Sequence, residues 1–292
     1  MAAWQIGCGQ ITWPRDVSEE KVLADIAAAG YAGAPVFPKP ATSTADRIAM
    51  WQRFGLKPAP GYLAGDFWDP ARFDVIMAQT ETYAKFAKDV GVDACYVAAN
   101  VDGNKVQNGQ TRMQAAGHVT EADGMTESEW TQFIRTITEV GQIMQSHGIK
   151  AAFHNHVGSF IETRAELDRL MQSTSPDVLW LGPDTGHMAW AGGDVLDMVQ
   201  TYANRICTMH LKDVNAAAAV QARAAQTDYR GAERLGVWTE LGHGSIDFPA
   251  VFALLKQANF AGWLIVETDV TQLASARESA EQSRAYLRSL GL

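Results

Sequence analysis

The chain has 292 residues, of which 47% are hydrophobic and 20% are charged, and its formal net charge at pH 7 is −9. This acidic balance argues against nucleic acid and anionic membranes as partners, because both are bound through clustered Lys and Arg side chains. Three scattered cysteines argue against a disulfide framework, and neither a signal peptide nor an apolar run of about 20 residues that could cross a bilayer is evident, so we expect a cytoplasmic protein.

Short apolar runs alternate with amphipathic segments along the chain, which is typical of α/β proteins. We predict strands at residues 5–9, 34–37, 57–62, 94–99, 150–154, 178–183, 206–210 and 264–267. Helices are predicted between them, and three begin at Ser18, Thr126 and Thr163, where a capping residue precedes an acidic first turn. The last helix is predicted over residues 274–290.

Eight strand-like runs, each followed by a helix, predict a single (β/α)8 TIM barrel. An open doubly wound sheet is less favoured, because Gly7 and Gly9 begin a GxGxxG pattern that Thr12 breaks. No internal repeat or Pro/Ser-rich linker divides the chain, so we expect residues 1–292 to form one catalytic domain. Long segments near residues 101–126 and 215–240 follow predicted strands, and we expect both at the catalytic rim, as lids or subunit contacts.

Acids and imidazoles recur where the predicted strands end. Asp184 follows one apolar run, and His210 and Glu267 end two others. Taken singly, Asp184 is typical of a helix cap, and a strand-end histidine is more often a hydrogen-bonded core residue than a ligand. Because the carboxyl ends of barrel strands meet at one rim, however, we expect these three side chains to converge on one divalent cation.

The fourth ligand should come from the fifth strand, where the sequence offers two candidates. His154 ends that strand, and Glu162 follows a short loop just before the cap at Thr163. Glu162 could equally be an exposed acid in a first helical turn. We favour it as the ligand, because three carboxylates and one imidazole suit a hard cation. This donor set predicts Mn²⁺ or Co²⁺, with Mg²⁺ and Fe²⁺ as alternatives, rather than a structural zinc.

Four residues are candidates for catalysis. His154 and His156 lie two apart on one strand and would face the same pocket, where they could move protons. Lys212 could stabilise an oxyanion beside the cation, although a surface lysine is an equally good interpretation. His187, three residues after Asp184, is expected to touch the substrate.

Four polar or aromatic residues are candidates for substrate binding. Trp13 and Trp68 follow the first and third predicted strands and could form a wall for a sugar ring, although aromatic side chains there are more often core packing. Asn155 lies between the two strand-end histidines, and Glu240 begins a glycine-rich turn near the rim.

The segments HNHVGSFIET, PDTGH, HLKDV and ELGHGSIDF resemble the sugar phosphate isomerase/epimerase superfamily of xylose-isomerase-like TIM barrels, and within it the inosose dehydratase group. The similarity extends from IGCGQITWP near the start to GWLIVETD near the end. It implies one metal ion at the carboxyl-terminal rim, bound by Asp184, His210, Glu267 and a fifth-strand ligand that we assign to Glu162. Many relatives carry Glu where this chain has His154. Relatives often form dimers or tetramers, so a homo-oligomer is also implied.

We therefore expect a metal-dependent dehydratase that removes a proton α to the ketone of a keto-inositol or related keto-sugar and releases water. The paired His154 and His156 favour water loss, because an imidazole can donate a proton to a leaving hydroxyl near neutral pH. Return of the proton to carbon would instead make the enzyme a ketose epimerase or sugar isomerase, and a lyase acting on 3-keto-glycosides shares the first step. A sugar-binding barrel without catalysis would need no metal, and a nuclease would need a basic groove.

Overall fold

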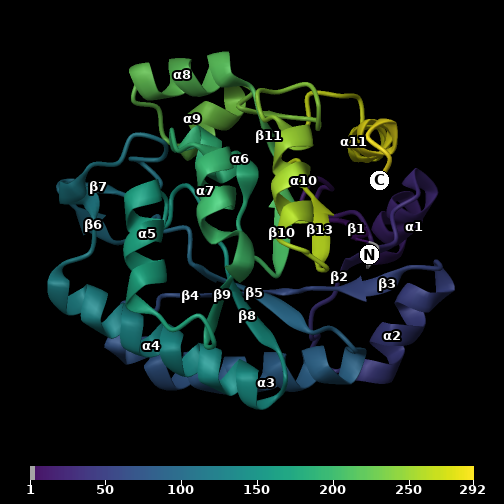
Figure 1. The fold of residues 1–292 in the computed structure, drawn as a ribbon, viewed down its shortest axis with the longest axis horizontal. Coiled ribbons are helices and arrows are strands. Elements are labelled where there is room, and N and C mark those ends of the chain that lie inside the picture. Colours follow the sequence, from purple (N-terminus) through teal and green to yellow (C-terminus); the bar gives the residue numbers. More distant parts are fainter. Residues whose placement is uncertain (1–3) are drawn as a thin grey trace.

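The computed structural model describes residues 4–292 and has parallel strands at its centre, with helices around them (Figure 1). The parallel strands are β1 (Gln5–Cys8), β2 (Gly33–Pro35), β3 (Lys57–Ala59), β4 (Tyr62–Gly65), β5 (Ala94–Ala99), β8 (Lys150–Phe153), β9 (Leu179–Leu181), β10 (Thr208–Leu211) and β13 (Trp263–Val266).

Eight strand positions close into a barrel. The strands form two sheets, in the orders β10-β13-β1-β2-β3 and β4-β5-β8-β9. Strand β3 pairs with β2 and β4 pairs with β5, so these two consecutive segments, separated by a Pro-Gly pair, together fill the third position. Isolated parallel bridges from Leu181 to Ile206 and from Asp184 to His210 join β9 to β10. The predicted (β/α)8 TIM barrel is therefore confirmed, although several strands end one or two residues before their predicted limits.

Helices follow the strands and surround the barrel. The α-helices are α1 (Glu19–Ala29), α2 (Thr44–Arg53), α3 (Phe73–Val90), α4 (Glu127–Ser146), α5 (Arg164–Ser173), α6 (Thr185–Trp190), α7 (Val195–Tyr202), α8 (Ala216–Ala224), α9 (Tyr229–Arg234), α10 (Phe248–Gln257) and α11 (Ala276–Ser289). Three short 3-10 helices are η1 (Pro70–Arg72), η2 (Glu121–Asp123) and η3 (Ala203–Arg205). The predicted caps are confirmed, since Ser18 caps α1 and capping boxes open α4 at Thr126 and α5 at Thr163. In the part of the chain that is described, none of the helices has the length and apolar character needed to span a membrane.

Alternating residues of the strands build two layers of the core. On β5, Cys95 and Val97 belong to the large apolar cluster between the strands and the helices. Tyr96 between them points into the barrel, because side chains alternate along a strand. Its hydroxyl oxygen lies 2.7 Å from Thr208 Oγ1, and its ring centroid lies 4.1 Å from that of His210. The barrel interior therefore packs directly against one of the strand-end residues.

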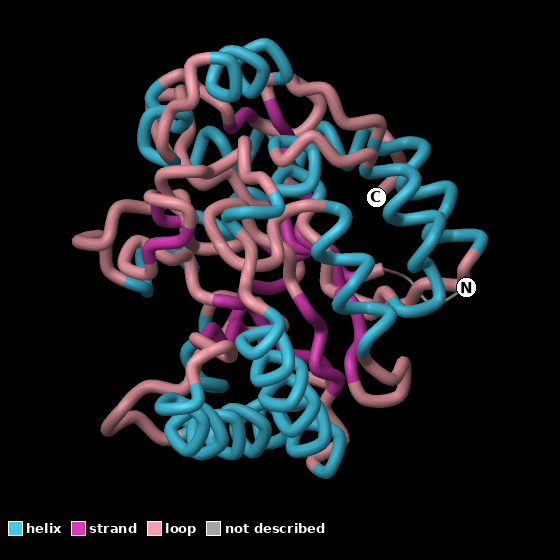
Figure 2. Tube along the Cα trace, turned by 90° about the vertical axis from the view of Figure 1, so that its left-hand side faces the viewer, coloured by secondary structure: helices cyan, strands magenta, loops and turns pink. Residues whose placement is uncertain are grey.

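The two long segments predicted at the rim have structure of their own. Residues 101–126 contain the hairpin of β6 (Val106–Gln107) and β7 (Gln110–Thr111), and residues 215–240 contain α8, α9 and β12 (Trp238–Thr239), which pairs with β11 (Asp213–Val214). The backbone N–H of Tyr229 donates to the carbonyl of Met113 and joins the two segments. Helices α8 and α9 lie together at the top of Figure 1, and the turn about the vertical axis in Figure 2 keeps them at that end of the molecule.

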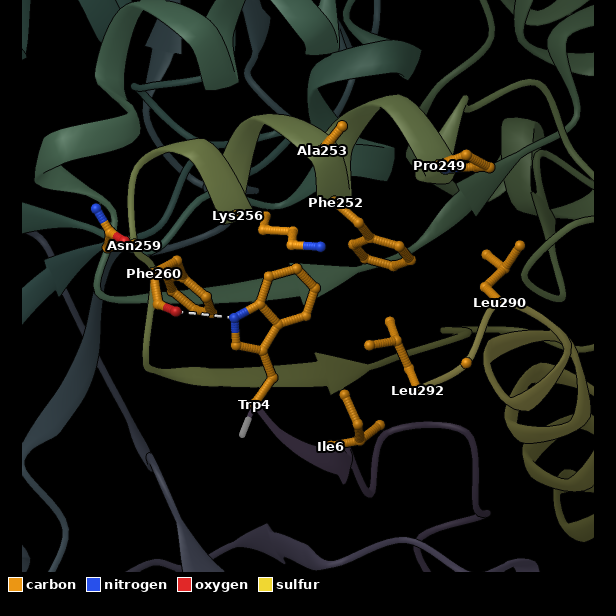
Figure 3. Close-up of a pocket in the computed structure, with 11 residues that line it drawn as sticks. Trp4, Ile6, Pro249, Phe252, Ala253, Lys256, Asn259, Phe260, Leu290 and Leu292 are labelled. Atoms are coloured by element: carbon orange, nitrogen blue, oxygen red, sulfur yellow. Dashed lines mark hydrogen bonds between the residues drawn. The ribbon is translucent and has the colours of Figure 1, made fainter. Parts of the chain in front are cut away.

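An apolar cavity of about 610 Å³ lies beside α10, at the amino-terminal end of β1 (Figure 3). Trp4, Phe252 and Phe260 supply its aromatic walls, and Trp4 Nε1 donates a hydrogen bond of 2.8 Å to the Phe260 carbonyl. The described residues that line it include Lys256 but no carboxylate or imidazole. These described side chains lack the carboxylates and imidazoles that hold metal ions, and the active sites of TIM barrels lie at the opposite, carboxyl-terminal rim.

Replacement of Tyr96 tests how far the barrel interior stabilises the fold. Tyr96→Phe removes only the hydroxyl beside Thr208 and should lower the free energy of unfolding by about 1 kcal/mol. Tyr96→Ala also opens a cavity and should lower it by about 3–5 kcal/mol. Urea denaturation followed by circular dichroism measures both values, and equal losses for the two variants would contradict the close packing of this ring.

Candidate active site

Three side chains converge where β9, β10 and β13 reach the carboxyl-terminal rim. Asp184 lies in the turn after β9, His210 lies near the end of β10, and Glu267 directly follows β13. Asp184 Oδ2 lies 3.8 Å from His210 Nδ1, and Glu267 Oε2 lies 3.2 Å from the same nitrogen. The structure thus brings these three predicted ligands together.

His154 joins this group at the end of β8. Atoms of His154, Asp184 and His210 that could bind a metal all lie within 4.8 Å of one another. His154 Nδ1 lies 3.2 Å from the carbonyl oxygen of Gly182, so Nδ1 carries the proton and Nε2 keeps its lone pair for a cation. Burial, with a further contribution from His210, holds the pKa of His154 well below its usual value, so the ring is neutral.

The structure does not bring Glu162 to this group, contrary to our expectation. Glu162 Oε1 accepts the backbone N–H of Gly117 at 2.8 Å, and Oε2 accepts that of Gly158 at 2.7 Å. Burial raises the pKa of Glu162 to about 7, although Arg112 and the two N–H donors oppose the shift. Both carboxylate oxygens therefore accept backbone hydrogen bonds that connect the loop after β8 to the 101–126 segment. Glu162 is also not the exposed acid of the alternative interpretation, because its side chain is buried.

Asp184 is a helix cap as well as a candidate ligand, so the two interpretations of this residue are compatible. Its Oδ1 accepts the backbone N–H of His187 at 2.9 Å at the start of α6, which leaves Oδ2 for the site. Asn155 Oδ1 accepts the Asp184 N–H at 3.0 Å, and Asn155 Nδ2 donates to the Asp184 carbonyl at 3.3 Å. Asn155, which we expected to bind substrate, is fully buried and orients Asp184 instead.

The atoms that face one another in this group fit a metal ion. Within residues 4–292, Asp184 Oδ2 and His210 Nδ1 are buried and make no well-directed hydrogen bond, although Lys212 Nζ and Glu267 Oε2 respectively lie 3.2 Å from them. Buried polar atoms without such a bond are rare, and a bound cation would satisfy both of them once His210 has lost its proton. Two carboxylates and two imidazoles form a donor set that divalent transition metals accept.

Lys212 brings a buried ammonium beside the same carboxylates. Its Nζ lies 2.6 Å from Asp269 Oδ1, 3.2 Å from Asp184 Oδ2 and 3.5 Å from Glu267 Oε2. Burial would lower the pKa of Lys212, but the three carboxylates outweigh it and raise the pKa, so the amine stays charged. A Cβ on Gly186 would lie 2.7 Å from Lys212 Cγ, which explains why the PDTGH segment has glycine there. Lys212 is therefore a residue of the site and not the surface lysine of the alternative interpretation.

The charges in this group depend on one another. Burial would raise the pKa of Asp184, but Lys212 and the neighbouring imidazoles outweigh it and hold this pKa well below its usual value. Burial also opposes the ionisation of Glu267, yet His210 and Lys212 lower the pKa of Glu267 to about 2. Burial would lower the pKa of His210, but Glu267 and Asp184 raise it to about 9. A metal ion would therefore have to displace a proton from His210.

His156 is the imidazole available for proton transfer. Its Nδ1 lies 2.7 Å from the carbonyl oxygen of Val157, so Nδ1 carries the proton and Nε2 has a free lone pair. Its ring centroid lies 3.6 Å from that of His187. His187 is fully buried, accepts the Val157 N–H at Nδ1 and lies 3.2 Å from Lys212 Nζ through Nε2. His187, which we expected to touch substrate, therefore supports His156 and Lys212.

A cavity of about 970 Å³ opens at this end of the barrel. The described residues that line it include the candidate catalytic groups His154, His156, His210, Lys212, Glu267 and Asp269. Its other walls come from the strand ends, as with Pro35 and Ala99, and from the two rim segments, through Met113 and Tyr229. The cavity is large enough for a sugar-sized ring.

Three predicted substrate contacts lie elsewhere. Trp13 is buried in the core between barrel and helices, where its Nε1 donates to Asp25 Oδ2 at 3.2 Å. Trp68 is partly buried against the same core. Glu240 is buried, and its Oε1 accepts the hydroxyl of Thr271 at 2.5 Å. For the two tryptophans, the alternative interpretation as core packing is the one that the structure supports.

Sequence reasoning misses two residues of the site. Asp269 lies two residues after Glu267, and the period of two in extended chain is a signal that could have assigned it to the same side. Tyr229 lines the cavity from α9, and its hydroxyl donates to Asp269 Oδ2 at 3.2 Å. No pattern in the 215–240 segment distinguishes Tyr229, because its place depends on how that segment folds over the rim.

Known proteins with similar sequences and structures agree with this architecture. A family model described as xylose isomerase-like TIM barrel matches residues 23–290. The inosose dehydratase of Geobacillus kaustophilus (strain HTA426) is 29% identical over 274 residues, which cover 91% of this chain and 87% of that protein. The rhizopine catabolism protein MocC of Rhizobium meliloti is 29% identical over 276 residues, which cover 91% and 81%. The crystal structure of the IolI protein with a bound zinc atom has a TM-score of 0.71 at 16% identity, over 98% of this chain and 97% of that one.

The structural match establishes only the fold, whereas the family match establishes membership of a family. The likeness to the IolI protein, at 16% identity, shows the fold alone. The family model covers nearly the whole chain, and the relatives that match over most of their length include inosose dehydratases. The resemblance seen in the sequence is therefore confirmed, and the chain is an enzyme that belongs to the xylose isomerase-like TIM barrel family.

Proposed function

We propose that this enzyme is a metal-dependent dehydratase that acts on a keto-inositol or a related keto-sugar. Its 29% identity to inosose dehydratases supports this reaction. The observation that carries the proposal is the meeting of His154, Asp184, His210 and Glu267 at one edge of a cavity of about 970 Å³. A polyhydroxylated six-membered ring fits a cavity of this size, and the same cavity offers His156 as a base.

A divalent metal ion would be held by His154, Asp184, His210 and Glu267. Compared with three carboxylates and one imidazole, this set has one more nitrogen donor, so Mn²⁺, Co²⁺, Fe²⁺ or Zn²⁺ suits it better than Mg²⁺. The zinc atom of the IolI protein, which shares the fold, is consistent with this preference. When bound, the cation supplies a Lewis acid for the ketone of the substrate.

His156 is the base in this proposal, and it acts without His154. The lone pair of His154 Nε2 belongs to the ligand set, Lys212 is held in its charged form, and His187 is fully buried. Burial, with a further contribution from Lys212, lowers the pKa of His156, so its ring is neutral and can accept a proton at Nε2 near neutral pH.

The same imidazole can complete the elimination. Removal of the α-proton converts His156 to an imidazolium and leaves the electron pair of the C–H bond shared between carbon and the ketone oxygen. Lys212, an ammonium at the cavity edge, stabilises that negative charge. The imidazolium then gives its proton to the β-hydroxyl, the C–O bond breaks, and water leaves as the double bond forms. A single residue thus serves as base and acid, which favours dehydration over epimerisation.

The reaction can be identified with 2-keto-myo-inositol in D₂O. Protein loaded with Mn²⁺ or Co²⁺ should convert it to a dehydrated product, which proton NMR and the absorbance of the unsaturated ketone both detect. Incorporation of deuterium without loss of water would instead identify an epimerase or isomerase, and a turnover only of 3-keto-glycosides would identify a lyase of that class. Protein treated with a chelator is the control.

Replacement of His156 tests its role as the base. His156→Asn keeps a side chain of similar polarity but has no group that accepts a proton near neutral pH, so kcat should fall by about 10²–10⁴-fold. The content of bound metal should stay at the wild-type level, because His156 is outside the ligand set. Steady-state kinetics and metal analysis measure the two quantities, and a loss of metal together with activity would mean that His156 is a ligand instead.

The two candidate ligands after β8 can be separated by metal binding. His154→Ala should weaken the binding of Co²⁺ by about tenfold or more, since one of four donors is lost. Glu162→Gln should bind Co²⁺ as the wild type does, but its NH₂ would face a backbone N–H, which should lower the free energy of unfolding by about 1–3 kcal/mol. Calorimetric titration and urea denaturation measure these effects, with Asp184→Ala as the control that loses the metal. The opposite pattern would restore Glu162 as the ligand.

A further inference from the structure

We infer that Tyr229 is a positioning residue that, through Asp269, keeps the ammonium of Lys212 from moving fully between the metal ligands Asp184 and Glu267. This inference rests on the proposed function, because it assigns Asp184 and Glu267 to a cation. It concerns a residue of the rim segment at 215–240, which neither the ligand set nor the proton-transfer step includes.

Lys212 faces a conflict between two sets of carboxylates. Its Nζ is close to Asp184 Oδ2, at 3.2 Å, and to Glu267 Oε2, at 3.5 Å, and both residues belong to the proposed ligand set. An ammonium that moved fully between these two carboxylates would neutralise the charge that the metal ion needs, and would compete with it. The position of Lys212 therefore matters for metal binding as well as for catalysis.

Asp269 offers Lys212 a closer partner than either ligand carboxylate does. Asp269 Oδ1 lies 2.6 Å from Lys212 Nζ, which is shorter than either distance to the ligand carboxylates. The face of Trp238 lies 5.0 Å from the same ammonium and attracts it as well. Both contacts compete with Asp184 and Glu267 for the charge of Lys212.

Tyr229 holds the carboxylate of Asp269 in the orientation that pairs it with Lys212. Its hydroxyl donates to Asp269 Oδ2 at 3.2 Å, so one oxygen of Asp269 holds Tyr229 and the other holds Lys212. The ring of Tyr229 is held by two aromatic contacts. It stacks on His156 with a centroid distance of 6.1 Å and an interplanar angle of 11°, and its centroid lies 5.0 Å from that of Trp190. Without the hydroxyl, Asp269 loses the bond that sets its orientation.

The rim segment is anchored firmly enough for this role. Tyr229 and Trp238 belong to a small apolar cluster of their own, together with Trp190 and Val157. The N–H of Tyr229 is bonded to the other rim segment. Through Tyr229 and Asp269, the position of Lys212 therefore depends on the folding of the 215–240 segment.

Tyr229→Phe is the direct test, with the affinity of the apoprotein for Co²⁺, measured by calorimetric titration, as the first readout. We expect the Kd for Co²⁺ to rise about three- to tenfold, the range that the loss of one hydrogen bond covers, and kcat to fall with little change in KM. Tyr31→Phe is the matched control, because it also removes a buried hydroxyl bond, of 2.9 Å to the Ala280 carbonyl, and neither residue lines the cavity. Tyr31→Phe should change neither Kd nor kcat.

A double mutant distinguishes positioning from a general loss of structure. In a Lys212→Met background, Tyr229→Phe should leave the Kd for Co²⁺ unchanged, because no ammonium remains to compete. Asp269→Asn, tested alone, should raise the Kd at least as much as Tyr229→Phe does. An equal Kd for wild type and Tyr229→Phe, or an equal rise with and without Lys212, would overturn the inference, as would a wild-type protein that binds no Co²⁺. Since the titration needs no substrate, failure to turn over 2-keto-myo-inositol or any related keto-sugar would refute the proposed function and leave this test intact.

Discussion

The grouping of three carboxylates around one ammonium is the interaction on which the rest of the site depends. Charged groups are expensive to remove from water unless each is paired, and Asp184 and Lys212 are almost completely buried. Lys212 compensates one of the three charges on Asp184, Glu267 and Asp269, so two remain when the imidazoles are neutral. These two uncompensated negative charges by themselves favour the binding of a divalent cation.

The architecture of the barrel could be predicted because its signals are local. Apolar runs of strand length recur between amphipathic segments, and caps such as Ser18, Thr126 and Thr163 mark helix starts from side-chain chemistry alone. The pairing of β11 with β12 and the small cluster beneath α8 and α9 could not be predicted, because they depend on contacts between residues far apart in the sequence. Divided strands such as β3 and β4 were missed for the same reason.

The candidate site was predictable where topology determines it. Asp184, His210 and Glu267 end adjacent strands of a closed barrel, so their meeting follows from the order of the strands. We assigned Glu162 to the metal from the preference of a hard cation for carboxylates, which does not reveal where a loop turns. In the structure, the backbone N–H groups of Gly117 and Gly158 donate to its two carboxylate oxygens. Trp13 was misassigned because an aromatic side chain near a strand end can turn either to the cavity or to the core.

The candidate reacting groups and part of the cavity wall come from different parts of the chain. The groups proposed for metal binding and proton transfer extend from strand ends, where the barrel and residues such as Asn155 and Gly186 fix their positions. Tyr229 and Met113 line the same cavity from the rim segments, whose packing is separate from the main core. Because the strand ends fix the candidate reacting groups, the part of the cavity wall that the rim segments supply can change with little effect on them. The contact between Tyr229 and Asp269 is the exception, since there a rim segment acts directly on the charges of the strand ends.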